Sequence, residues 1–247
     1  MNRYSVVTLF PDLIESFRHT GVVRRCVERG LISVDVINPR EFAGDRRSTV
    51  DDAPYGGGPG MVMMVEPLRR AIERAKQRDP RPSHVVYLSP QGRRFDQRSV
   101  HDLLRHEHLV LIAGRYEGID ERVIATDIDD EWSIGDVVLS GGEIPAMLII
   151  DALARILPGA LGDARSAEQD SFSNNLLDHP HYTRPKIVAG HKVPAVLLSG
   201  DHAAIARWRR QQQLGRTYLK RPDLLSGEVL NPEDQALLNE FIKDFEE

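Results

Sequence analysis

Residues 132–143 read Trp-Ser-Ile-Gly-Asp-Val-Val-Leu-Ser-Gly-Gly-Glu, so three glycines surround a short apolar run. Because glycine lacks a side chain, backbone N–H and C=O groups can approach a ligand closely at such positions. Similar glycine-containing turns occur at residues 88–92 and 113–118. Three turns of this kind in one chain predict a binding crevice that is lined mainly by backbone.

Apolar, β-branched runs near these turns predict the strands of an α/β fold. Alternation of these strands with helical patterns favours a mostly parallel sheet with helices on both faces. Ligands bind such sheets outside the carboxyl ends of the strands, where all three glycine turns would lie. The expected strands cover residues 4–10, 31–37, 84–88, 109–113 and 133–139, and the expected helices cover residues 67–77, 97–105 and 145–157.

The 247-residue chain has an ordinary globular composition, and no apolar run approaches the roughly 18 residues that span a bilayer. Its first residues lack a signal-peptide pattern. The single cysteine, Cys26, excludes an internal disulfide and a multi-cysteine metal site. We therefore expect a cytoplasmic protein that does not enter a membrane.

Charge is distributed unevenly along the chain. Residues 184–221 contain nine Lys and Arg residues and one acid, Asp201, so this stretch carries +8 and the rest of the chain −13. Such segregation makes a polyanionic partner as plausible as a solvated basic face. We expect Asp201 to cap a helix that runs to about residue 214. Trp208 lies among the cations of this helix, and we expect it to pack in a core rather than to stack on a base.

Periodicity disappears at residues 158–175, where small and acidic residues alternate as in a mobile linker. We therefore divide the chain into three parts. The first is an α/β domain at residues 1–160, the second a flexible linker at residues 161–175 that carries Asp170, and the third a small, mainly helical, basic domain at residues 176–247.

Common fingerprints of nucleotide and metal sites are missing from the sequence. Neither G-x-G-x-x-G nor G-x-x-x-x-G-K-[ST] occurs, which argues against nucleotide-dependent oxidoreductases, P-loop NTPases and ordinary Rossmann methyltransferases. The sequence also lacks His-Glu-x-x-His, and we expect His179 and His181 to be structural loop residues rather than metal ligands.

Residues 54–61 read Pro-Tyr-Gly-Gly-Gly-Pro-Gly-Met. They form either a tight surface loop or a loop that presses against a planar base or a chain backbone. Asp51 and Asp52 precede this segment, and their carboxylates could accept hydrogen bonds from the Watson–Crick edge of a guanine.

Three further charged residues have both a structural and a functional interpretation. Asp170 is either solvated or, if the linker closes over a substrate, a desolvated base whose pKa rises from about 3.9. Arg155 either makes an ion pair near a helix end or stabilises negative charge on a substrate oxygen. Glu117 either pairs with Arg115 or binds a ligand ammonium or a hard cation.

The whole chain resembles the bacterial tRNA (guanine-N1)-methyltransferases, which modify the guanine at position 37, immediately 3′ of the anticodon. The resemblance implies the SPOUT class, in which the sheet of the α/β domain ends in a deep trefoil knot that binds S-adenosylmethionine. It also implies a homodimer whose active site lies at the subunit interface, since the catalytic Asp and the cofactor come from different subunits. The segments that carry the resemblance are residues 49–61, 87–92, 114–122, 132–145, 166–172 and 181–185.

The resemblance also assigns roles to residues. Asp170 would be the general base that removes the proton of guanine N1, and Arg155 would stabilise the developing charge on O6. Magnesium is associated with the family, with Glu117 as a conjectural ligand and no dedicated metal cage in the sequence. Apart from the resemblance, we expect substrate contacts at Asp51 and Gly60 beside the glycine-rich segment and at Arg184, Arg209 and Arg210 in the basic region. The cofactor contacts are Tyr87, Leu88, Ser89, Gly114, Tyr116, Glu117, Ile134, Gly135, Asp136, Val137, Val138, Leu139, Gly141 and Gly142.

Three alternative functions stay open at this point. They are a non-catalytic RNA-binding protein of the same fold, a methyltransferase of the same fold that acts on ribosomal RNA or ribose, and a nucleotide-dependent oxidoreductase. The presence of both Asp170 and Arg155 argues against the first, and the long linker with a separate basic domain argues against the second.

Overall fold

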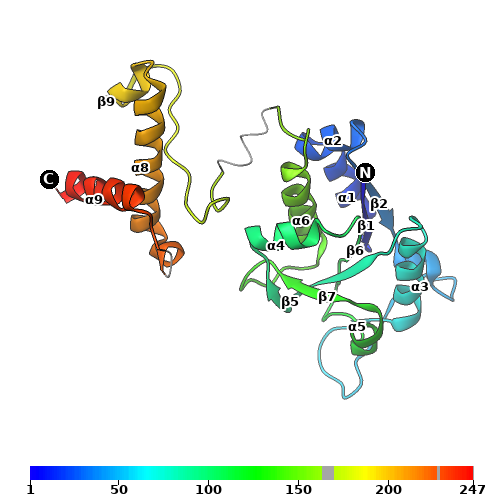
Figure 1. The fold of residues 1–247 in the computed structure, drawn as a ribbon. Coiled ribbons are helices and arrows are strands. Elements are labelled where there is room, and N and C mark those ends of the chain that lie inside the picture. Colours follow the sequence, from blue (N-terminus) through cyan, green and yellow to red (C-terminus); the bar gives the residue numbers. More distant parts are fainter. Residues whose placement is uncertain (163–169, 227–228, 247) are drawn as a thin grey trace. The chain divides into compact units, whose positions relative to one another are not determined.

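The computed structural model of the chain describes residues 1–162, 170–226 and 229–246 (Figure 1). Contacts within the chain divide it into two compact units, Met1–Ala164 and Arg165–Glu247. Residues 163–169 of the expected linker lie outside the described residues. Just after them, residues 170–175 form turns, in which the Phe172 N–H donates a hydrogen bond to the carbonyl of Leu176 at 2.7 Å.

The first unit is built on a five-stranded parallel sheet with the strand order β2-β1-β6-β5-β7. The expected α/β class with a mostly parallel sheet is therefore confirmed. The strands of this sheet are β1 (Asn2–Val7), β2 (Ile32–Ile37), β5 (His84–Arg94), β6 (His108–Ile112) and β7 (Asp130–Ser133).

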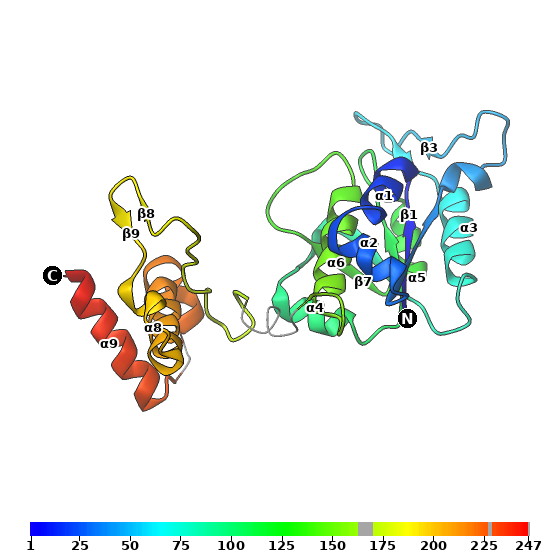
Figure 2. The ribbon, with the colours of Figure 1, turned by 90° about the horizontal axis from the view of Figure 1, so that it is seen from above.

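Side chains of the strands alternate between two apolar cores, because successive residues of a strand point to opposite faces. In β6, Leu109 and Leu111 belong to one core, and Val110 and Ile112 belong to the other. Figures 1 and 2 show α3 on the opposite side of the sheet from α1, α2 and α6. The first core is covered by α1 (Pro11–Arg18), α2 (Gly21–Glu28), α4 (Gln97–Leu103) and α6 (Glu143–Ile156), and the second by α3 (Val65–Lys76) and α5 (Glu121–Asp127).

The expected strand at residues 133–139 is wrong. β7 ends at Ser133, and residues 134–142 form an irregular turn. Gly135 adopts a φ of 135°, its N–H donates to the Ser133 hydroxyl at 3.2 Å, and its carbonyl accepts from the Val137 N–H at 2.8 Å. These local hydrogen bonds replace the ladder of a strand, and they leave Val137 and Val138 exposed.

The turn expected at residues 88–92 is a bulge inside a longer strand. β5 continues to Arg94, and both Leu88 and Arg93 pair with Trp132 of β7. The chain between them therefore bends out of the ladder before it rejoins β7. A Cβ atom on Gly92 would lie 2.4 Å from the backbone nitrogen of Trp132, so only glycine permits this close approach.

The glycine-rich segment at residues 54–61 joins two short antiparallel strands, β3 (Asp51–Asp52) and β4 (Val62–Met63). The Met63 N–H donates to the carbonyl of Gly118 at 3.0 Å, which attaches this hairpin to the turn that follows β6. A short 3-10 helix, η1 (Pro39–Phe42), follows β2.

The second unit has a helical core, in which Leu214 of α8 packs with Leu237 and Leu238 of α9. The Asp201 carboxylate accepts hydrogen bonds from the N–H groups of Ala203 and Ala204, both at 3.0 Å, which confirms the expected helix cap. None of the helices in the described ranges is long and apolar enough to cross a membrane. The elements of this unit are β8 (Ile187–Val188), β9 (His191–Lys192), η2 (Ala195–Leu198), α8 (His202–Lys220), η3 (Pro222–Leu225) and α9 (Pro232–Glu246).

Candidate active site

A pocket of about 380 Å³ lies at the bulge of β5 and at the carboxyl ends of β6 and β7. The bulge of β5, the turn after β6 and the turn after β7 all contribute to its wall. Of the fourteen expected cofactor contacts, twelve line this pocket, and Gly135 and Asp136 do not. The three glycine-containing segments therefore meet at one pocket, and its role as a cofactor site stays a prediction.

The turns pack against one another through their backbones. A Cβ atom on Gly114 would lie 2.8 Å from the ring of Tyr87, and one on Gly142 would lie 2.7 Å from the Cα of Ala113. The Gly142 N–H also donates to the carbonyl of Gly114 at 2.9 Å. The turn after β7 therefore rests on the turn after β6, and a side chain at Gly142 would force these two turns apart, whereas one at Gly114 would displace the ring of Tyr87.

A buried ion pair holds these two turns in place. Arg115 Nε donates to Glu143 Oε1 at 3.1 Å, and Arg115 Nη1 donates to the carbonyl of Ser140 at 3.0 Å. Glu143 is only 1% exposed and also accepts a hydrogen bond from the Thr8 hydroxyl at 2.8 Å. The guanidinium lies over the ring of Phe10, 4.1 Å from its centroid.

Sequence reasoning missed this anchor. It left open a pairing of Arg115 with Glu117, whereas the structure pairs Arg115 with Glu143, a residue 28 positions further along the chain. The sequence offered one signal for this ion pair. Glu143 is an acid at the start of an apolar helix, and Arg115 is a cation in another glycine turn. Helix α6 places Glu143 in its first turn, where an acid is favoured by the helix dipole.

Two tyrosines give the pocket an aromatic wall with neutral phenols. Burial raises the pKa of Tyr87, so its phenol stays protonated at neutral pH. Desolvation also raises the pKa of Tyr116, and a hydrogen bond to Asp51 adds to this effect. Tyr116 adopts a φ of 61°, an uncommon backbone conformation for a residue with a side chain. The hydrogen bond between Tyr116 and Asp51 places Asp51, which we expect to contact the substrate, next to the pocket.

Gly60 and Glu117 form a second link between the glycine-rich hairpin and the pocket. A Cβ atom on Gly60 would lie 2.3 Å from Glu117 Oε1, so the carboxylate rests directly on the hairpin backbone. The Glu117 N–H donates to the carbonyl of Met61 at 3.0 Å. Asp51 and Gly60 thus both adjoin residues that line the pocket.

A family model described as tRNA (Guanine-1)-methyltransferase TrmD matches residues 2–227. The chain belongs to this family. It is 59% identical over 244 residues to a protein named tRNA (guanine-N(1)-)-methyltransferase from Methylococcus capsulatus, covering 99% of this chain and 97% of the relative. It is 56% identical over 239 residues to the protein of that name from Vibrio cholerae, covering 97% of each chain.

Arg155 and Asp170 are the two residues that are expected from the sequence to be catalytic. Arg155 lies in the last turn of α6, where a cation also interacts favourably with the helix dipole. Asp170 lies in the second unit, where its carbonyl accepts a hydrogen bond from the Ser173 N–H at 3.2 Å. The two expected catalytic residues therefore belong to different compact units of this chain.

The three basic residues expected to contact tRNA differ in their surroundings. Arg184 is exposed, and Arg209 is exposed beside a hollow of the second unit. Arg210 instead donates two hydrogen bonds to Asp234, at 2.8 and 2.7 Å, and thereby ties α8 to α9. The guanidinium of Arg210 therefore stabilises the second unit. Trp208, on the same helix, is half-buried, and its ring centroid lies 6.4 Å from that of Tyr182.

Proposed function

We propose that this chain transfers the methyl group of S-adenosylmethionine to N1 of the guanine at position 37 of tRNA, immediately 3′ of the anticodon. The observation that carries the proposal is the meeting of three glycine turns in one pocket of a chain that belongs to the tRNA (Guanine-1)-methyltransferase family. A tRNA substrate would place the reaction in the cytoplasm.

The pocket suits S-adenosylmethionine in size and chemistry. Its volume of about 380 Å³ lies within the range of small-molecule sites. Gly114, Gly141 and Gly142 line the pocket without side chains, so the adenine and ribose of the ligand can approach the backbone closely there. We infer that the three turns are part of the deep trefoil knot of SPOUT methyltransferases, and that Gly135 and Asp136 support the turn that carries the other cofactor contacts.

S-adenosylmethionine would supply a methyl group that is bound to a sulfonium. When the methyl group is transferred, the rest of the molecule leaves as a neutral thioether, which requires no metal. The protein contributes geometry, because methyl transfer requires an in-line approach of the nucleophile. Guanine N1 carries a proton, and Asp170 removes it as general base. Arg155 donates to O6 as negative charge develops there. Asp51 and Gly60 position the guanine, and Glu117 would hold a magnesium ion.

The active site is completed by two subunits in this proposal, with Asp170 of one acting on the cofactor pocket of the other. Support comes from apolar side chains at the surface of the pocket region. Val138 is 84% exposed in the turn after β7, and Ile144 and Leu148 are exposed on α6. Single exposed apolar side chains are ordinary, but three on adjoining segments favour a protein contact.

The test is methyl incorporation from labelled S-adenosylmethionine into tRNA transcripts. The expected result is incorporation into a transcript with guanine at position 37 and its loss when adenine replaces that guanine, with the label mapped to N1. Equal incorporation into both transcripts would contradict the site of transfer. Absence of incorporation into either transcript would contradict the activity.

A further inference from the structure

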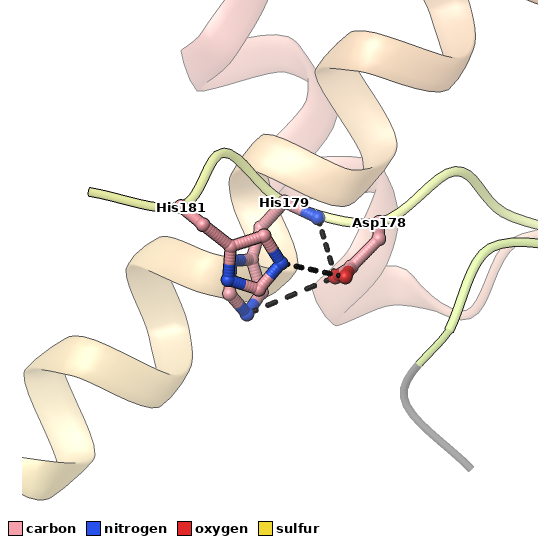
Figure 3. Close-up of side chains that lie close together, drawn as sticks. All are labelled: Asp178, His179 and His181. Atoms are coloured by element: carbon pink, nitrogen blue, oxygen red, sulfur yellow. Dashed lines mark hydrogen bonds and ion pairs between the residues drawn. The ribbon is translucent and has the colours of Figure 1, made fainter. Parts of the chain in front are cut away.

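The second unit contains a group of side chains to which the proposed methyl transfer assigns no role. Asp178, His179 and His181 lie in the segment before β8, and their ligand atoms all lie within 4.8 Å of one another. Figure 3 shows the two imidazole rings close to the carboxylate, with dashed lines joining a ring nitrogen of each to Asp178. The rings are tilted by 46°, and their centroids lie 4.4 Å apart.

The two histidines approach the carboxylate from different environments. His181 is exposed, with 71% of its side chain accessible, and its Nε2 lies 2.8 Å from Asp178 Oδ2. His179 is buried, with 8% of its side chain accessible, and its Nε2 lies 3.8 Å from Asp178 Oδ1. One ring therefore makes a hydrogen bond to Asp178, and the other stops short of one.

The hydrogen bonds of His179 decide which of its nitrogens carries the proton. Its Nδ1 lies 3.3 Å from the carbonyl of Pro180, and a carbonyl can only accept, so Nδ1 is the donor. With the proton on Nδ1, the Nε2 lone pair of His179 lies 3.8 Å from Asp178 Oδ1 with no proton between them.

We propose that Asp178, His179 and His181 bind a divalent transition-metal ion of the zinc class, with at least one further position open to solvent, in place of the purely structural role that the sequence suggests for the two histidines. A cation resolves the conflict between the His179 lone pair and the carboxylate. Ligands about 2.0–2.2 Å from a tetrahedral ion lie about 3.4 Å apart, and the Asp–His separations here are 2.8 and 3.8 Å. The ion replaces the proton that His181 shares with Asp178.

The surroundings of the group favour this chemistry. Two imidazoles and one carboxylate suit Zn²⁺, Co²⁺ or Ni²⁺, whereas Mg²⁺ prefers oxygen ligands. The bond from His179 Nδ1 to a backbone carbonyl is the outer-sphere contact that metal-binding histidines usually make. Asp178 is held by its N–H, which donates to the Ser171 hydroxyl at 3.0 Å. Arg209 lines the same hollow but is exposed, so solvent screens its repulsion of the ion.

The experiment compares metal binding by the chelator-treated full chain and by His181→Ala. Because His181 is exposed, its removal leaves the packing of the unit intact. The wild type is expected to bind one Zn²⁺ more tightly than the variant, by at least tenfold, and to show a tetrahedral Co²⁺ absorption spectrum that the variant lacks. His191→Ala, which removes an exposed histidine outside the group, is expected to behave as the wild type.

A thermal melt provides the second measurement. An ion that binds the folded state raises its melting temperature, so Zn²⁺ is expected to stabilise the wild type and His191→Ala but not His181→Ala. Equal Zn²⁺ affinity in the wild type and His181→Ala overturns the proposal, as does a wild type that binds none. Neither result depends on methyl transfer, so the metal site and the proposed activity are tested independently.

Discussion

The carboxylate of Glu143 and the guanidinium of Arg115 form an ion pair beside the cofactor pocket, with Glu143 Oε2 3.0 Å from Arg115 Nη2. Thr8, at the end of β1, donates to the other carboxylate oxygen at 2.8 Å. The pair therefore connects the sheet, the turn after β6 and the start of α6. Because Arg115 also binds the carbonyl of Ser140, the position of the turn after β7 depends on this buried carboxylate.

Glu143→Gln is expected to weaken S-adenosylmethionine binding about tenfold, which corresponds to about 1.4 kcal/mol. The amide keeps the shape of the side chain but removes the charge that orients Arg115. Isothermal titration calorimetry measures the affinity. Glu66→Gln, which breaks an exposed Glu66–Arg70 pair on α3, is the matched control and should bind normally. Unchanged affinity in Glu143→Gln would mean that the turn is held by other contacts.

Gly142→Ala is expected to reduce cofactor affinity by more than tenfold. The added methyl group would lie 2.7 Å from the Cα of Ala113, and backbone cannot move aside as a flexible side chain can. Gly44→Ala is the control, because a Cβ there meets no atom within 4 Å. Equilibrium binding of labelled S-adenosylmethionine measures the affinity of each variant. Equal affinities would show that the close backbone contact at Gly142 is not needed for cofactor binding.

Asp170→Ala and Arg155→Ala are each expected to lose at least about a hundredfold in turnover, the usual contribution of a positioned proton acceptor or charge-stabilising donor. Cofactor affinity should stay within about twofold of the wild type, since neither residue lines the pocket. Single-turnover methylation and calorimetry give the two values. Near-normal turnover of Asp170→Ala would remove it as the general base.

The shared active site makes a separate prediction. A mixture of Asp170→Ala and Gly142→Ala chains, unfolded together and refolded, should regain activity that neither variant has alone. A heterodimer would then combine an intact pocket from one chain with an intact Asp170 from the other. Methylation that stays at the level of the separate variants, in a mixture shown to contain heterodimers, would contradict a site built from two subunits.

Arg209 and Arg210 are neighbours in sequence that should respond differently to substitution. Arg209→Ala should lower the slope of log tRNA affinity against log salt by about 0.7, the value for one phosphate contact to a single strand. Arg210→Ala should instead destabilise the second unit by about 1–3 kcal/mol, because Asp234 would be left buried without its partner. Salt-dependent binding and urea unfolding measure the two effects. Equal slopes for the wild type and Arg209→Ala would exclude the phosphate contact.

Much of the scaffold could be predicted from sequence, because buried parallel strands such as β6 are continuous apolar runs and the glycine turns follow them. The strand expected at residues 133–139 could not be excluded in this way. Val137, Val138 and Leu139 have the composition of a strand, and only the backbone of Gly135 shows that the chain reverses. The Thr8–Glu143 contact joins residues 135 positions apart, which no local pattern encodes.

The buried histidine His108 is expected to make the stability of the fold depend on pH. It is buried in β6 with its Nε2 3.1 Å from the Ser5 hydroxyl, and burial lowers its pKa. The unfolded chain therefore binds a proton at this residue more readily than the folded chain. Stability should fall as pH drops below about 6.5, the pKa of an unperturbed histidine, because protonation then favours the unfolded state.

Urea unfolding of the wild type and His108→Gln, at about pH 7.5 and about pH 5.5, tests this linkage. Glutamine can retain a hydrogen bond to Ser5 but does not titrate in this range. The wild type should therefore lose more stability between the two pH values than the variant does. His19→Gln, which changes an exposed histidine of α1's C-cap, should keep the pH dependence of the wild type. If His108→Gln shows the full wild-type dependence, the loss of stability between these pH values arises from other groups, such as His106, whose pKa is also lowered by burial.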